Sequence, residues 1–595
     1  MLSLISGFDF GAGWTGGGLG ALDWAIVLGL LVFTTWVGHR KSGSQGSGRD
    51  FFLGGRSLPW YAVAASIVAT EISAVTFVSL PAVVWRPGGN LTYLQIGLFG
   101  SLIARLIVGF VLVPAYFEKE IYSPYDYVGR RLGEHARRMT TVLFAIGGVL
   151  GQSARVYLTA VVLEVLLPGE LRAIGGLFGV SSLTAAVGCI GAVAVVWTWM
   201  GGLATVVWTD AILFLLFLAG AGGTLLVLNG LLEDGMLGAI RDGYHAGKLQ
   251  LIDTSMDLHR PYTLMVAVFV ASIGQVGPYG CDQLMVQRLL GCRDARAARW
   301  AILASMAAMV LIFVIALVGV GLWAWTSTAQ HWGGGGARAL VRELPERIFP
   351  VFVGTMMPAG AKGLVVAGVF AAAISSLDSI LAALSQTTLS LLPERSRSAR
   401  ATVRLSRILV GIYGVLLCAT AVATSWVAER YDSILDLALA MAGYTGGALL
   451  AAVGLALVGR HSPGSARGGA GYLISAPLSV LCVVAVAWHG PGIAANLAAV
   501  GATLAGLLLL RGFRGTLAAG QAAGQTVLLA ACLAGVAALA FYGSLPPAPG
   551  TSDPGSLPWP WYVPIGTLVA WLGAYAFDVP PSGSTSPNTE ASREI

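Results

Sequence analysis

The sequence predicts an all-α protein that crosses a lipid bilayer many times. Of its 595 residues, 56% are hydrophobic and only 11% are charged, and the mean hydropathy is +0.77. Soluble domains carry about 25% charged residues, so this chain lacks the material for an ordinary water-facing surface. Apolar runs such as 22–37, 211–228 and 301–323 approach or exceed the roughly 20 residues with which a helix spans a bilayer. The alternating pattern of a membrane β-barrel is absent from the sequence.

Counting the apolar runs along the chain predicts about fifteen transmembrane helices, with ends placed to within several residues. The expected spans are 22–39, 57–85, 91–117, 138–167, 181–199, 205–230, 262–285, 297–325, 360–391, 402–427, 433–458, 470–488, 491–510, 525–543 and 560–577. No connecting loop is long enough for a soluble catalytic domain, and no GxxxxGK[ST], HExxH or GxSxG motif occurs. An ATP-driven pump and an enzyme are therefore unsupported.

Arginine and lysine are distributed unevenly among the expected loops. Alternate loops are rich in them, and the positive-inside rule places such loops in the cytoplasm. The residues concerned are Arg40, Lys41, Arg49, Arg130, Arg131, Arg137, Arg138, Arg288, Arg293, Arg296, Arg299, Arg395, Arg397, Arg400, Arg404, Arg460, Arg467, Arg511 and Arg514. This pattern predicts a multi-pass protein of the cell membrane with its N-terminus outside and its C-terminus inside. The net charge of +6 then reports orientation in the bilayer, and no nucleic-acid partner is expected.

Ionisable residues inside the predicted spans are few, and each is costly to bury in a bilayer unless it is paired or solvated. They are Glu71, Arg105, Arg155, Glu164, Asp210, Asp282, Asp378 and Asp436. Each is a candidate functional group, although a structural ion pair explains any single one equally well. Arg105 in particular is expected to pair structurally.

Two predicted spans carry signs of an interrupted helix. Residues 266–290 read VAVFVASIGQVGPYGCDQLMVQRLL, in which three glycines and Pro278 within about two turns would break a helix. The span five helices earlier, 57–85, has no breaker in its middle, and its interruption is inferred only from Glu71, Ser73 and Thr76. Paired broken helices at corresponding positions of two halves point to a secondary transporter's binding site. A simple packing kink is the alternative.

The span 360–391 contains the polar stretch SSLDSILAALSQTT. Ser375 and Ser379 lie one turn apart on one face of this helix, and Ser376 is adjacent. Clustered oxygen ligands suit a hard cation such as sodium. The alternative is helix–helix packing through small residues, which is common in membranes.

Four stretches of the chain together resemble the sodium:solute symporter family, whose members take up sugars, amino acids, vitamins, monocarboxylates, iodide or sialic acids. They are GGRSLPWYAVAASIVATEISAVTFVSLPA (54–82), TWMGGLATVVWTDAILF (198–214), YGCDQLMVQRLL (279–290) and SSLDSILAALSQTT (375–388). The four occur in family order and spacing, and the resemblance spans roughly 22–458.

The resemblance implies a LeuT-type fold of two inverted repeats with five helices each. Residues 1–56 would hold an N-terminal segment with the first transmembrane helix, 57–231 the first repeat and 262–458 the second. Additional helices would occupy 459–577, about four of them, and 578–595 would form a disordered cytoplasmic tail.

The resemblance also implies a sodium site between the first and eighth core helices. Its ligands would be the carbonyl oxygens of Ala69, Ile72 and Ala372 and the hydroxyls of Ser375 and Ser376. Na⁺ is the only cofactor expected.

A second sodium site would recruit Asp210, Ser375 and Ser379. The sequence has Asp378 where two-sodium members carry a serine, which leaves the stoichiometry open. Candidates for the gate or the ion path are Glu71, Asp210 and Asp282, and a capping or pairing role is the alternative for Glu71.

Solute in this family sits between the broken helices and the third core helix, here 138–167. The candidate solute-binding residues are Gln152, Arg155, Thr76, Tyr279 and Gln283. The planar fork of Arg155 could bind a carboxylate, which favours an organic anion. Alternatively, Arg155 pairs with Glu164, Glu71 or a backbone carbonyl.

These implications favour a sodium-coupled symporter that imports a small organic anion by alternating access. A neutral sugar or amino acid is the alternative solute, and a non-transporting sensor or a channel is the alternative from another class. The expected partners are a small-molecule solute and the lipid bilayer. The sequence does not determine the oligomeric state, and a monomer is the simplest expectation.

Overall fold

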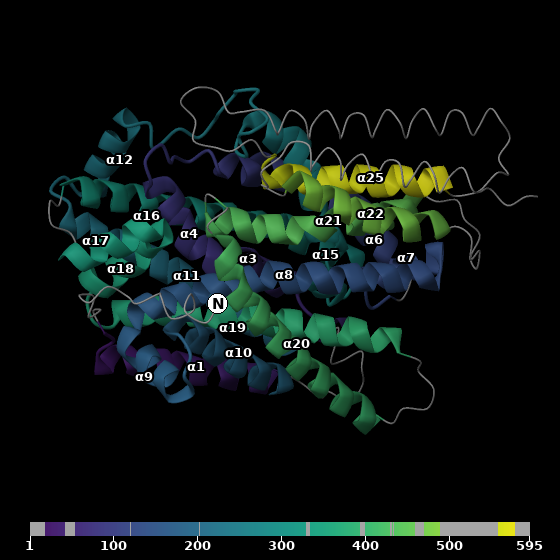
Figure 1. Cartoon of the computed structure of the whole chain (residues 1–595), viewed down its shortest axis with the longest axis horizontal. Coiled ribbons are helices and arrows are strands. Elements are labelled where there is room, and N and C mark those ends of the chain that lie inside the picture. The colour runs from purple at the N-terminus through teal and green to yellow at the C-terminus, as the bar shows by residue number, and fades with distance from the viewer. Residues whose placement is uncertain are drawn as a thin grey trace, which may run out of the picture.

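The computed structural model describes residues 18–41, 54–118, 121–200, 203–328, 334–392, 399–428, 431, 433–458, 469–487 and 557–577. Over these residues the protein is built of helices and contains no β-strand, which confirms the all-α class. Eight described helices are long and apolar enough to cross a membrane, or nine when one bent pair is counted as a single span. The long helices run side by side along the horizontal axis of Figure 1.

The helices of the first part of the chain follow the expected spans closely. They are α1 (Ala21–Lys41), α3 (Trp60–Glu71), α4 (Ala74–Trp85), the continuous run of η3 (Ile96–Ser101), α5 (Leu102–Ile107), η4 (Val108–Leu112) and α6 (Val113–Phe117), then α8 (Glu134–Leu166), α10 (Ser182–Met200) and α11 (Leu203–Leu231).

The later helices follow their expected spans as well. They are η5 (Val266–Ala271), α13 (Ser272–Val276), η6 (Gly277–Cys281), α14 (Gln283–Leu290), α15 (Ala295–Ala304), η7 (Ser305–Ala307), α16 (Ala308–Thr328), α19 (Ala361–Leu391), α20 (Ala399–Ala428), α21 (Ile434–Val458), α22 (Ala470–Ala487), η9 (Trp559–Trp561) and α25 (Tyr562–Phe577). The expected spans 491–510 and 525–543 and the tail 578–595 lie outside the described residues.

Short helices that the sequence analysis did not anticipate cover the two ends of the bundle. At one end lie α9 (Pro168–Phe178), α12 (Gly235–His245), α17 (Gly334–Glu343) and α18 (Ile348–Met356), and at the other lies α7 (Pro124–Leu132) (Figure 1). The serine before α7 supplies a capping box, since Ser123 accepts from the Asp126 amide and Asp126 accepts from the Ser123 amide.

The first broken helix lies where the polar residues predicted it. The backbone leaves the helix at Ile72 (φ −85°, ψ 75°) and Ser73 (ψ 175°), and α3 and α4 meet at 53°. The last bond of α3 runs from the Ile72 amide to the Val68 carbonyl, at 2.9 Å. The carbonyls that follow Val68 are released from the helical ladder, because the last carbonyls of a helix have no intrahelical partner.

The second break lies one residue beyond the glycine–proline cluster. Residues Gly277–Cys281 form a π-helical turn, and the extended residue is Asp282 (ψ 129°). Its carboxylate accepts from the Leu284 amide at 2.8 Å and so caps α14. Just beyond α14, a backbone hydrogen bond from Leu58 to Gly291 (3.1 Å) ties that helix's end to the start of α3. Each half of the core therefore opens with a broken helix.

One topology assignment from the sequence is wrong. Arg288 was counted among the cytoplasmic loop residues, but α14 continues to Leu290 and the Arg288 side chain is only 2% exposed. The apolar run ends earlier than the helix, so a loop was inferred where the chain remains folded into the core.

Candidate sodium and solute site

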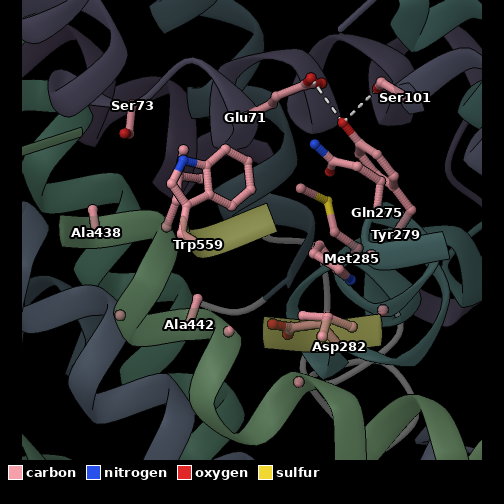
Figure 2. A pocket seen from close by; sticks show the side chains of 18 of the residues that line it. Glu71, Ser73, Ser101, Gln275, Tyr279, Asp282, Met285, Ala438, Ala442 and Trp559 are labelled. Atoms are coloured by element: carbon pink, nitrogen blue, oxygen red, sulfur yellow. Dashed lines mark hydrogen bonds between the residues drawn. The ribbon is translucent and has the colours of Figure 1, made fainter. Parts of the chain in front are cut away.

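A cavity of about 230 Å³ lies where the two broken helices meet α8 and α21. Its lining comes from α3, α4, η6, α14, α8 and α21, with further residues from 559–563. Figure 2 shows Glu71, Tyr279, Asp282 and Trp559 around this space. The volume is near the lower end of the range of ligand pockets, about 300–1,000 Å³. The cavity fits a small organic solute.

Glu71 and Tyr279, two of the predicted residues, belong to one hydrogen-bonded cluster at the cavity wall. The Glu71 carboxylate forms an ion pair with Arg105, and the Tyr279 hydroxyl donates to Glu71 Oε1 at 2.8 Å. Tyr279 also lies 2.9 Å from the Ser101 hydroxyl (Figure 2). The guanidinium of Arg105 stacks 4.2 Å from the Tyr279 ring centroid. Glu71 and Arg105 thus form a structural ion pair, which is the expected role of Arg105 and the alternative to a gating role for Glu71.

Arg155, on α8, lines the cavity and forms no salt bridge among the described residues, although the Asp282 carboxylate of the same cavity interacts with it electrostatically. Its Nη1 donates to the Thr70 carbonyl at 3.3 Å, and none of the ion pairs between described residues includes it. This carbonyl was released by the break after α3, so the broken helix orients the arginine. Of the five N–H donors of its guanidinium, one is engaged in this bond.

Gln152 lies one turn before Arg155 on the same helix and lines the same cavity. Its side chain is 7% exposed, and Oε1 has no hydrogen-bond partner in the described structure. The Thr445 hydroxyl of α21, also in the lining, is buried without a partner as well. Buried polar atoms are satisfied in most native structures, so orphaned atoms facing a cavity indicate a place for a bound molecule.

The remaining predicted solute residues divide. Thr76 and Tyr279 line the cavity, as does Asp282, which was predicted as a gate or ion-path residue, whereas Gln283 does not. Gln283 is fully buried elsewhere, with Nε2 donating to the Tyr122 carbonyl (3.2 Å) and to Gln386 Oε1 (3.4 Å). The break at Asp282 sets the phase of α14, and the first residue after it points away from the cavity. The prediction that Gln283 contacts solute is corrected accordingly.

The five residues implied as sodium ligands lie on α3, at its break and on α19. Ala69 of α3 packs in one small cluster with Ala371 of α19, and Ala69, Ile72, Ala372, Ser375 and Ser376 are all buried. The break after Glu71 frees carbonyl oxygens on one side, and α19 presents serine hydroxyls on the other. Carbonyl and hydroxyl oxygens are the ligands that hard cations prefer, so these residues could hold Na⁺.

The residues of the predicted second site also meet, but a buried arginine lies among them. Asp210 Oδ2 accepts from Arg288 Nη2 at 3.0 Å and from the Ser66 hydroxyl at 2.6 Å. The same Nη2 donates to the Ser379 hydroxyl at 2.9 Å, and Ser375 donates to Asp210 Oδ1. A guanidinium therefore supplies the positive charge between Asp210 and Ser379.

Sequence reasoning missed Arg288 and Ser66. Arg288 lies in the VQRLL stretch quoted above, six residues after Asp282. A charge that falls within two turns of a predicted break, before the chain has left the membrane, is the signal that could have identified it. Ser66 carries no comparable signal, since a lone serine in a membrane span is common at helix contacts.

A model of the sodium:solute symporter family matches residues 51–462. The match covers more than half of the chain and includes both broken helices and α19. The chain belongs to the sodium:solute symporter family. Na⁺ is therefore the coupling ion of this symporter, and its substrate is a solute that crosses the membrane with it.

Relatives of this symporter differ in the solutes that their names give. One is the sodium-coupled monocarboxylate transporter 2 of Bos taurus, 25% identical over 450 residues that cover 73% of this chain and 68% of the relative. Another is the sodium/glucose cotransporter of Vibrio parahaemolyticus, 28% identical over 377 residues, 60% of this chain and 64% of the relative.

A solved structure shares the fold. A Na⁺-coupled sialic acid symporter in a substrate-bound outward-open state matches with a TM-score of 0.66 at 21% identity, over 81% of this chain and 93% of that one. This likeness confirms the LeuT-type architecture that the resemblance implied.

Proposed function

We propose that this symporter imports a small organic anion together with Na⁺. The observation that carries the proposal is Arg155, which lines the cavity with its guanidinium bonded, within the described part of the chain, to a carbonyl and to no carboxylate. A cation in a buried cavity attracts an anion strongly, because the low dielectric screens it little. The planar donor fork suits a carboxylate, and Gln152 one turn away offers a further polar contact.

Sodium in this proposal binds to Ala69, Ile72, Ala372, Ser375 and Ser376 and links α3 to α19. Its binding would fix the break after Glu71 and with it the Thr70 carbonyl that orients Arg155. The ion and the anion then favour each other's binding, and alternating access carries both across. Glu71 and Asp282 lie at the two breaks and would move when the gates exchange.

The position of Arg288 supports a ratio of one Na⁺ per solute. A second Na⁺ at Asp210 would have to displace a guanidinium that is hydrogen-bonded to Asp210 and Ser379. One Na⁺ with one monovalent anion moves no net charge. The membrane potential, worth about 2.3 kcal/mol per charge per 100 mV, then contributes nothing to solute accumulation. A tenfold sodium gradient supplies about 1.4 kcal/mol for it.

A zwitterionic amino acid is the second candidate solute. Asp282 lines the same cavity as Arg155, so one carboxylate and one guanidinium face a single space. A sugar has no charge to match either group. We propose further that the protein lies in the cell membrane with its N-terminus outside, acts as a monomer and catalyses no chemical reaction.

The test uses purified protein in proteoliposomes with an inward sodium gradient. Labelled benzoate, alanine and glucose are compared, with choline replacing sodium as the control. We expect sodium-driven benzoate uptake, and we expect Arg155→Gln to abolish it while the stabilisation of the protein by sodium persists. Arg155→Lys keeps the charge without the fork and should retain a small part of the uptake. Uptake of alanine or glucose instead of benzoate would reject the anion.

A further inference from the structure

The wall of the cavity is completed by a segment outside the family match. Trp559, Pro560 and Val563 line the cavity, and Figure 2 shows Trp559 between Glu71 and Ala442. The matched region, however, ends at residue 462. The three lining residues belong to η9 and the first turn of α25. A part of the chain that the family pattern does not specify thus contacts the space where the solute is proposed to bind.

The segment is held there by close packing against α21. A Cβ atom on Gly447 would come within 2.6 Å of the Thr567 backbone, and one on Gly443 within 3.2 Å of the Tyr562 Cβ atom. Small residues at such a contact let membrane helices approach closely. Tyr562 also stacks on Tyr444 of α21, with ring centroids 5.8 Å apart. The start of α25 is therefore fixed relative to the core.

The indole of Trp559 is oriented by a hydrogen bond. Its Nε1 donates to Asp436 Oδ1 at 3.0 Å, and the same carboxylate accepts from Tyr262 and, at 2.6 Å, from Ser433. Because its only donor is engaged, Trp559 can offer a solute only the apolar surface of the ring.

Other side chains in the lining extend this apolar surface. Met285, Leu439 and Val563 contribute hydrocarbon or thioether groups. A solute hydroxyl placed against them would lose its water without gaining a hydrogen-bond partner, which is costly. An aliphatic or aromatic body would instead be favoured by burial.

We propose that Trp559 is a specificity-determining residue, which selects carboxylates with an apolar body over polyhydroxylated ones. This inference rests on the proposed anion import and names the class of anion. The carboxylate is bound by Arg155, and the indole face packs against the hydrocarbon part of the same solute.

The experiment measures binding of acetate, benzoate, gluconate and glucose to the full-length protein by thermal unfolding in saturating sodium. Wild type should bind benzoate more tightly than acetate and should not bind gluconate. Trp559→Ala should weaken benzoate by at least about tenfold, since even one methylene in an apolar pocket is worth about 10–200-fold, and acetate by less than about threefold. Trp559→Phe keeps a ring and should stay within about threefold of wild type for both.

Trp561→Ala is the matched control, because Trp561 lies in the same turn of η9 but outside the cavity lining. It should leave the ratio of benzoate to acetate affinity unchanged. Sodium stabilisation retained by all variants shows that they are folded. The role of Trp559 would be overturned if Trp559→Ala lost equal affinity for acetate and benzoate. It would also be overturned if Trp561→Ala lowered the ratio of benzoate to acetate affinity as much as Trp559→Ala does. Tight gluconate binding by wild type would reject the class, and glucose binding without any carboxylate binding would reject the anion import itself.

Discussion

Replacing Arg288 with glutamine would leave Asp210 as a buried charge with no cation. Asp210 is 0% exposed, and its ion pair with Arg288 joins α11 to α14. The Ser66 hydroxyl is hydrogen-bonded to both Asp210 and Arg288, and the Ser379 hydroxyl accepts from Arg288. Arg288→Gln therefore removes a charge from a network that is otherwise satisfied.

The expected cost is large because the pair is buried. Removing one partner of a buried ion pair destabilises a protein by about 3–5 kcal/mol. In Arg288→Gln, Na⁺ can take the vacated place beside Asp210, Ser375 and Ser379. A ligand at about 100 times its Kd returns about 2.7 kcal/mol, so sodium should restore roughly half of the loss or more. Asp210→Asn combined with Arg288→Gln should cost less than the two single changes summed, by about 0.5–3 kcal/mol.

Unfolding of the purified variants is measured at increasing sodium concentration, together with the sodium dependence of benzoate uptake. Arg288→Gln should gain more stability from sodium than wild type, and its uptake should rise more steeply with sodium. Arg293→Gln is the control, since its pair with Asp294 is exposed, 80% for the arginine, and worth about 0–1 kcal/mol. A loss under about 1 kcal/mol in Arg288→Gln, or an unchanged sodium response, would refute the reasoning.

Two further predictions concern the sodium site and the loop that follows α12. Ser376→Ala should raise the sodium concentration for half-maximal uptake roughly tenfold to a hundredfold, since contacts to a charge are worth about 1.5–3 kcal/mol. Ser385→Ala is the control on the same helix, because the Ser385 hydroxyl lies 2.8 Å from that of Ser406. It should leave this sodium concentration unchanged. The Lys248 ammonium donates to carbonyls at the end of α4, and its hydrogen bond to the Arg86 carbonyl measures 2.6 Å. Burial, followed by the charge of Arg86, lowers the pKa of Lys248 to about 8. This pKa is below the unfolded value, so the unfolded chain binds more protons between about pH 8 and 10.5 and stability rises with pH over that window. Lys248→Met should abolish this rise in the unfolding temperature, and an identical pH profile in both proteins would contradict the assignment.

The sequence predicted the features that depend on composition and local pattern. Apolar length located the described spans, and Glu71, Ser73 and Thr76 located a break that contains no glycine or proline. In the second break, the glycine–proline cluster bends the helix into a π-helical turn, and the interruption itself falls at Asp282. Gln283, the first residue after this interruption, points away from the cavity, because neighbouring positions of a helix face different directions.

Features that depend on contacts between distant segments could not be predicted. Arg288 carries the charge of a loop residue, and only its contact with Asp210, 78 positions away, explains its burial. Trp559 has no motif, and its place in the cavity follows from the packing of α25 on the glycines of α21. Charge counting and apolar periodicity describe each helix by itself, so neither contains this information.

Coupling between the ion and the solute is tested most directly by measuring benzoate affinity for the purified protein at increasing sodium concentration. Because linkage is reciprocal, sodium bound between α3 and α19 should tighten benzoate binding in wild type, choline should not, and Ser376→Ala should require much more sodium for the same effect. A benzoate affinity that is the same with sodium and with choline would contradict the account.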